Sequence, residues 1–115
     1  MGPYSQAVVR GDWLFASGQI PIDPSTGELV EGNIEAQTER VIANLAAVLE
    51  EGGSSLDRVV RATVYLTDLS LFPRVNVIYA EHFCGDPAPA RATVGVAALP
   101  LGADVEIDAI AMVGP

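Results

Sequence analysis

Between residues 34 and 51, apolar side chains recur about every 3.6 positions, whereas the segments on either side alternate with a period of two. Four of these side chains form one stripe, which consists of Val41, Leu45, Val48 and Leu49. Asn33 is the expected N-cap, and Gly52 and Gly53 are expected to end the helix. A helix with one apolar face buries that face against another element, so the pattern predicts a helix packed on a sheet.

The strands of this sheet are predicted from alternation and from turn residues. Residues 59–67 alternate most clearly, and their apolar face consists of Val60, Ala62, Val64 and Leu66. Residues 7–10 and 13–17 flank Gly11-Asp12, which predicts a hairpin. Further strands are expected near 91–97 and 104–113.

A second, shorter helix is predicted from Leu71 to Phe83, with Asp68 or Ser70 as its cap and Pro73 in its first turn. About five strands with two helices on one face give a single α+β domain over residues 1–115. A sheet covered on one face only favours an oligomer, because a chain of this size commonly finds its second cover in another subunit.

Composition narrows the possible functions. The net charge of −9 argues against nucleic acid as a partner, because phosphates would be repelled. All six basic residues are arginines, which rules out any mechanism that requires a lysine of this chain. The sequence shows neither a membrane-length apolar run nor a secretory signal, so we expect a cytoplasmic protein with no membrane partner.

The single cysteine and the single histidine offer no metal-site spacing, and we expect neither a metal nor a cofactor. Cys84 follows Phe83 in an apolar run and is interpreted as a buried small hydrophobe rather than a nucleophile. His82 is interpreted as a surface or interface side chain.

Arg91 is the strongest candidate for ligand binding. It follows a proline-bearing segment at the start of a predicted strand, and no acidic residue lies between Asp86 and Asp104. Two interpretations stay open. Arg91 either forms a structural ion pair with Glu106 or Asp108, or binds the carboxylate of a ligand, for which guanidinium geometry is well suited.

Glu106 and Asp108 are two positions apart on a predicted strand and therefore share a face. Such a pair can divide the roles of acid and base, although it also occurs simply as the solvated face of an edge strand. Gly18 ends a strand, where a glycine lets a ligand approach backbone N–H groups.

Several segments taken together resemble the RidA/YjgF family along almost the whole chain. The N-terminal matches are Gly2-Pro3-Tyr4-Ser5-Gln6-Ala7, Ser17-Gly18-Gln19-Ile20-Pro21, Asp23-Pro24 and Gly27. The later matches are Val75-Asn76, Tyr79, Pro89-Ala90-Arg91-Ala92, Ala97-Ala98-Leu99-Pro100 and Val105-Glu106-Ile107.

This resemblance implies a chorismate-mutase-like α+β fold, in which a mixed sheet carries two helices on one face. It also implies a homotrimer with ligand sites between subunits. The implied activity is cofactor-free hydrolysis of 2-enamino and 2-imino acids, such as 2-aminoacrylate, to 2-keto acids and ammonia. The alternatives are a non-catalytic module that binds 2-keto acids and a paralogue that acts on another imine or enamine.

The resemblance also implies roles for individual residues. Arg91 matches the arginine that holds the substrate carboxylate, and Glu106 matches the glutamate near the attacking water. The other residues that it places around the substrate are Tyr4, Ser17, Gly18, Asn76, Thr93 and Pro100. Some members have cysteine or alanine where this chain has Thr93, so no thiol chemistry is implied there.

Two departures from the family pattern affect these expectations. Members usually carry a short first strand before the Gly-Pro-Tyr segment, whereas only Met1 precedes Gly2 here. Either the start has been trimmed or the strand is absent, and we expect Tyr4 to be held less firmly. Asp108 stands where glutamate is frequent, which shortens the side chain and keeps the charge.

Overall fold

The computed structural model describes residues 3–114, so Gly2 of the first matching segment lies outside the described residues. In chain order the main elements are β1 (Ala7–Arg10), β2 (Trp13–Gln19), α1 (Ile34–Glu51), β3 (Val59–Leu66), α2 (Phe72–His82), β4 (Ala90–Gly95) and β5 (Val105–Met112). Short 3₁₀ helices cover Leu56–Arg58, Leu69–Leu71 and Pro100–Gly102. The predicted hairpin of β1 and β2 is confirmed.

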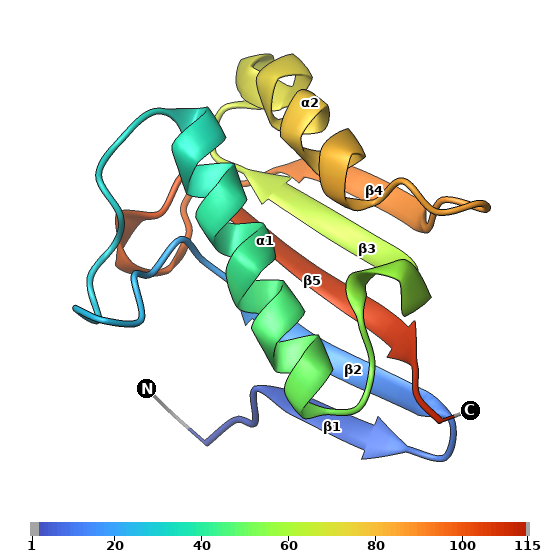
Figure 1. Ribbon diagram of the computed structural model, residues 1–115. Coiled ribbons are helices and arrows are strands. Elements are labelled where there is room, and N and C mark those ends of the chain that lie inside the picture. The colour runs from blue at the N-terminus through green and yellow to red at the C-terminus, as the bar shows by residue number, and fades with distance from the viewer. Residues whose placement is uncertain (1–2, 115) are drawn as a thin grey trace.

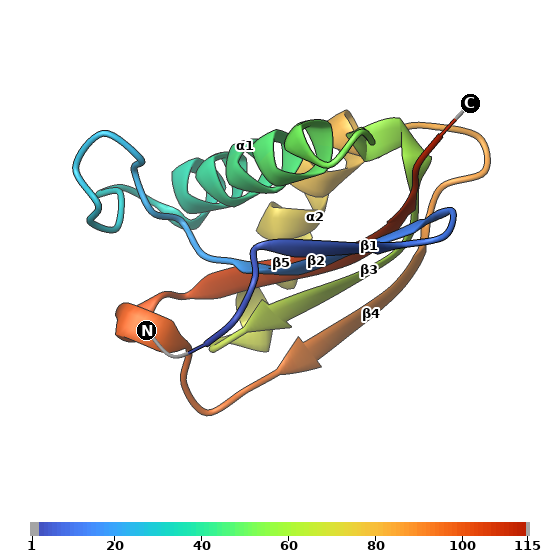
Figure 2. The same ribbon diagram turned by 90° about the horizontal axis from the view of Figure 1, so that it is seen from below.

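The strands form one mixed sheet in the order β1-β2-β5-β3-β4. Only β3 and β4 run parallel, and α2 makes the crossover between them, as a parallel pair requires. Figure 1 shows α1 and α2 lying across the sheet, and Figure 2 shows both helices on the same face. The expected α+β fold is confirmed.

Helix α1 covers the core, and its predicted bounds are confirmed at both ends. The Asn33 side chain accepts a hydrogen bond from Ala36 N at 2.9 Å and caps the first turn. The buried side chains of this helix are Ile34, Thr38, Val41, Ile42, Leu45 and Leu49. Val48, predicted to lie in the apolar stripe, packs against the core but is only half-buried, because it also lines two cavities.

A bulge in β3 corrects one predicted face. Val59 pairs with Ala111, but Arg61 pairs with Ile110, so Val60 is the extra residue between them. Val59 is therefore buried and Val60 is exposed, the reverse of the prediction for Val60. From Ala62 onwards the predicted alternation holds.

The second helix and the last strands are slightly shorter than predicted. Asp68 accepts hydrogen bonds from Ser70 N and Ser70 Oγ, at 3.0 and 2.7 Å, and so caps the 3₁₀ turn over residues 69–71. Helix α2 starts after this turn without a side-chain cap, so neither Asp68 nor Ser70 caps it. Pro73 lies in its first turn as predicted.

The sheet face opposite the helices is open and apolar. Its partly exposed side chains include Val8, Trp13, Phe15, Val94 and Met112. Phe15 is 46% exposed and Trp13 43%, although each lies on a strand with neighbours on both sides. The expectation of a half-covered sheet is therefore confirmed (Figure 2).

The segment after β2 is fastened to α1 by one side chain. Asn44 Nδ2 donates to the carbonyl oxygens of Ile20 and Ile22, at 3.1 and 2.8 Å. Arg40 Nε donates to Asn44 Oδ1 at 3.1 Å, which orients the amide. None of the helices in residues 3–114 is long and apolar enough to cross a membrane.

Candidate functional site

Arg91 lies on the helix-covered face, at the edge of the sheet. It pairs in register with Ala62 of β3, which is fully buried beneath the helices, and side chains in register point to the same face. Its Nη1 donates to Asn76 Oδ1 at 2.6 Å. Its Cζ lies 5.0 Å from the ring centre of Phe72 and 4.8 Å from that of Tyr79.

The Arg91 guanidinium therefore contacts an amide and two aromatic rings, all of them neutral. Within residues 3–114 it forms no ion pair with Glu106, Asp108 or any other carboxylate. The structural ion pair considered from the sequence is not formed in the single chain. An exposed guanidinium that is not paired with a carboxylate is suited to binding an anionic ligand.

Glu106 lies on β5 and points to the open face. It pairs in register with Tyr65 of β3, whereas its neighbours Val105 and Ile107 are buried beneath the helices. Burial raises the pKa of the Glu106 carboxyl, and the nearby charge of Asp108 raises it further. A carboxyl with a raised pKa is suited to exchanging protons near neutral pH.

Asp108 is on the same face as Glu106, as predicted. The Tyr65 hydroxyl donates to Asp108 Oδ2 at 2.8 Å, and this bond is the main reason that the pKa of Tyr65 is raised. The strand that carries both carboxylates is central, between β2 and β3, so the edge-strand interpretation of the pair is wrong.

Gly18 lies directly against Glu106. It sits in an irregularity of β2, between Ala16 and Gln19, where the register with β5 shifts. A β-carbon at Gly18 would lie 2.7 Å from Glu106 Cδ and closer still to Oε2. The absent side chain is thus what allows the carboxyl to rest on the backbone of β2. Ser17 Oγ donates to Ser5 O at 2.5 Å and joins the N-terminal segment to the same strand.

The predicted site residues fall into two groups. A cavity of about 350 Å³ brings together Tyr4, Gly18, Pro100 and Glu106, and Ser17 adjoins it in sequence. A second cavity of about 360 Å³ is lined by Asn76 and Arg91. Thr93 pairs with buried Val64 and so shares the face of Arg91. One chain does not bring Arg91 and Glu106 together.

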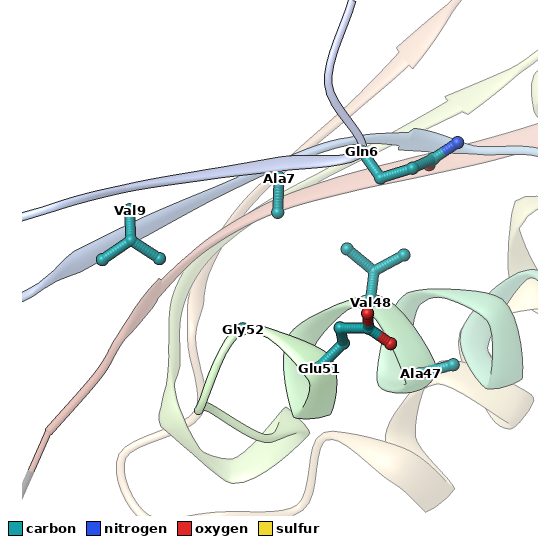
Figure 3. Close-up of a pocket in the computed structure, with 7 residues that line it drawn as sticks. All are labelled: Gln6, Ala7, Val9, Ala47, Val48, Glu51 and Gly52. Carbon is teal, nitrogen blue, oxygen red and sulfur yellow. The ribbon is translucent and has the colours of Figure 1, made fainter.

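A third cavity, of about 470 Å³, lies between β1 and the C-terminal half of α1 (Figure 3). Its walls include Ala7, Val9 and Val48, with Glu51 as its charged residue. It holds none of the predicted site residues. It adjoins the Glu106 cavity, because Gln6, Ala47 and Val48 line both.

Phe72 and Tyr79 are site residues that sequence reasoning did not single out for this role. They lie four residues before and three residues after Asn76, so all three share one side of α2. This helical spacing around Asn76 was the available signal. Burial raises the pKa of Tyr79, and the Arg91 charge counteracts part of that rise.

Cys84 is exposed, contrary to the prediction that it is buried. Helix α2 ends at His82, and Phe83 takes the buried position, so Cys84 falls in the following loop. His82 is a surface residue as interpreted, and its Nε2 lies 2.9 Å from Glu39 Oε1 of α1. In the described part of the chain, no three histidine, cysteine or carboxylate side chains are grouped as metal ligands.

Comparison with known proteins fixes the family. The model of the family described as endoribonuclease L-PSP matches residues 1–113. The chain belongs to this family. The sequence resemblance to RidA/YjgF proteins is thereby confirmed, and so is the fold that it implied.

Relatives match over nearly the full length of the chain. A RutC family protein of Pyrococcus abyssi is 53% identical over 111 residues, which are 96% of this chain and 87% of that protein. The crystal structure of YyfA, of the Rid protein family, from Yersinia pestis is 51% identical, with a TM-score of 0.94, and covers 98% of this chain and 90% of its own. E. coli TdcF, solved with bound serine, is 37% identical, with a TM-score of 0.90 and coverages of 99% and 91%.

Proposed function

We propose that this protein hydrolyses 2-imino and 2-enamino acids, such as 2-aminoacrylate, to the 2-keto acid and ammonia. The observation that carries the proposal is the Arg91 guanidinium, which is exposed and held by neutral groups only. A carboxylate is the natural partner of such a fork. The serine in the TdcF structure carries a carboxylate beside a nitrogen-bearing carbon, as the proposed substrates do.

We place the complete site between subunits of a homotrimer, with Arg91 from one subunit and Glu106 from the next. Within one chain the two side chains point to opposite faces of the sheet. The open apolar face, with Trp13 and Phe15 partly exposed, is the kind of surface that a second copy covers. Arg91 is exposed on the edge strand β4, where it is accessible to the open face of a neighbouring copy that carries Glu106.

In the proposed reaction, an enamino acid first takes a proton at its β-carbon to become the imine. Arg91 binds the carboxylate and holds the C=N carbon towards a water molecule. Glu106 accepts a proton from this water as its oxygen attacks that carbon, and the C=N bond becomes a C–N single bond. Glu106 returns its proton to the nitrogen of the resulting carbinolamine, the C–N bond breaks to release ammonia, and the hydroxyl group gives up its proton to solvent as the C=O bond of the keto acid forms.

Carboxylate binding and water activation use residues of the chain itself, Arg91 and Glu106. The raised pKa of Glu106 suits it to taking and returning protons, and such general acid–base help accelerates reactions by about 10²–10⁴-fold. Although the family is described as an endoribonuclease, the net charge of −9 disfavours RNA as the substrate.

The test is a coupled assay in which a dehydratase generates 2-aminoacrylate and the release of pyruvate and ammonia is followed. The wild-type protein is expected to speed this release above the spontaneous rate, and Arg91→Ala is expected to abolish the acceleration while the trimer persists in sedimentation. Arg74→Ala is the matched control, because Arg74 pairs with Glu35 away from the site. Binding of pyruvate without faster release would instead indicate a binding module.

A further inference from the structure

Three residues of α2 surround the guanidinium of Arg91. Asn76 lies between Phe72 and Tyr79 on one side of the helix and accepts a hydrogen bond from Arg91 Nη1. The rings of Phe72 and Tyr79 lie 5.0 and 4.8 Å from Cζ of Arg91. The arginine is thus held by two ring contacts and one hydrogen bond, all from a single helix.

The Tyr79 ring is itself fixed in place. Tyr79 is 6% exposed, and its ring stacks on Phe83 with 4.3 Å between centres and 18° between planes. A ring packed in this way cannot swing aside when the arginine moves. It is therefore a fixed surface against which the arginine rests.

The chemistry of these contacts keeps Arg91 ready for an anion. The face of an aromatic ring attracts a guanidinium cation and leaves all of the cation's N–H donors free. Asn76 uses one donor of the five that a guanidinium has, and none of the three partners neutralises the charge. A carboxylate in the place of the rings would hold the side chain equally well but would occupy the fork that a ligand needs.

We propose that Phe72 and Tyr79 are positioning residues, whose ring faces hold the Arg91 guanidinium in the orientation that receives the substrate carboxylate. The proposal rests on the proposed function for the identity of the ligand, but the ring contacts themselves can be tested without it. Without the rings, Arg91 spreads over more rotamers, and apparent affinity falls in proportion to the population that is ready to bind.

The structure offers a matched control at Tyr79. Its hydroxyl is buried and has no hydrogen-bond partner among residues 3–114, so Tyr79→Phe keeps the ring and removes only this group. Tyr79→Leu and Phe72→Leu remove a ring and keep an apolar side chain. Phe72 is only half-buried, so Phe72→Leu provides the test if Tyr79→Leu does not fold.

The experiment uses the full-length protein and two measurements. The first is the Nε–Hε signal of Arg91 in ¹⁵N NMR spectra, which is assigned through Arg91→Lys and shifted by the currents of two nearby rings. The second is the dissociation constant for pyruvate, measured by calorimetry. We expect each leucine variant to move the Arg91 signal towards its position in a peptide and to weaken pyruvate binding about two- to fivefold. Tyr79→Phe should leave both measurements close to wild type.

Either of two results would overturn the proposal. One is a folded leucine variant in which the Arg91 signal and the pyruvate affinity both stay at wild-type values. The other is Tyr79→Phe weakening binding as much as Tyr79→Leu, which would assign the effect to the hydroxyl. If the wild-type protein neither binds pyruvate nor accelerates its release in the coupled assay, the proposed function fails. In that case the NMR signal alone tests whether the rings hold Arg91. This part of the proposal then stands only if the leucine variants move the Arg91 signal towards its position in a peptide.

Discussion

Arg91 and Glu106 lie on opposite faces of one five-stranded sheet, Arg91 with the helices and Glu106 on the open side. The cause is strand geometry, because successive side chains of a strand alternate between its two faces. Arg91 is in register with buried Ala62, whereas Glu106 is in register with Tyr65 of the open face. One chain therefore does not bring the two side chains together, and this separation is the reason for proposing a site shared between copies.

Mixing two inactive variants should restore activity if the site is shared. Arg91→Ala keeps Glu106, and Glu106→Gln keeps Arg91. After the two are unfolded and refolded together in equal amounts, about one quarter of the sites of a random trimer combine both intact side chains. We expect about that fraction of wild-type keto-acid release. Activity that stays at background in a mixed trimer would place both residues in a single-chain site.

The pH dependence of the reaction should report Glu106. As a general base Glu106 must be ionised, so the rate should fall as the pH drops through its raised pKa. Asp108→Asn removes a negative neighbour, which lowers the pKa of Glu106 and moves the acid limb of the profile to lower pH. Asparagine can still accept the Tyr65 hydrogen bond, so the fold is kept. An acid limb that shifts to higher pH in this variant would contradict the assignment.

Gly18→Ala should displace the Glu106 carboxyl. The added methyl group overlaps Oε2 and Cδ of Glu106, so the carboxyl must leave the backbone of β2. We expect a large loss of activity, with a stability cost of about 1–3 kcal/mol in urea denaturation. Gly85→Ala is the control, because its nearest new contact is an ordinary 3.8 Å to Pro87 O. Equal activities of the two variants would show that the contact with Gly18 does not matter.

Replacing Asn44 should destabilise the protein. Asn44→Ala leaves the carbonyl oxygen of Ile22 without its donor and Ile20 O with only the backbone N–H of Ile22, which costs about 1–3 kcal/mol. Asn44→Asp should cost more, because it turns a carboxylate towards the same two carbonyl oxygens. Chemical denaturation at neutral pH measures both. If both variants were as stable as the wild type, the amide donors would not be what holds this segment.

Local signals were sufficient to predict much of the fold. Asn33, the apolar stripe and Gly52 set the bounds of α1, because caps and periodicity act within a few residues. The bulge at Val60 was missed because its cause is the register with β5, which is a distant segment. Cys84 was misplaced because one residue at the end of α2 decides which side chain turns inward.

The strand positions of Arg91 and Glu106 were predictable, whereas the arrangement of the candidate site was not. Their role in a site stays a prediction. Their placement on opposite faces depends on the residues of β3 with which they pair. This register between strands cannot be read from the local sequence. The rings beside Arg91 were missed because Phe72 and Tyr79 are also ordinary apolar residues of an amphipathic helix.

The Asn44 amide has a mechanical consequence. Its two hydrogen bonds tie the segment that follows β2 to the middle of α1, so that the two parts move together as one rigid unit. Gly18, which contacts Glu106, lies in β2 directly before this segment. A ligand that contacts Gly18 should therefore also stabilise α1, whose Asn44, Ala47 and Val48 line the same cavity, and slower amide exchange in this helix should report its occupancy.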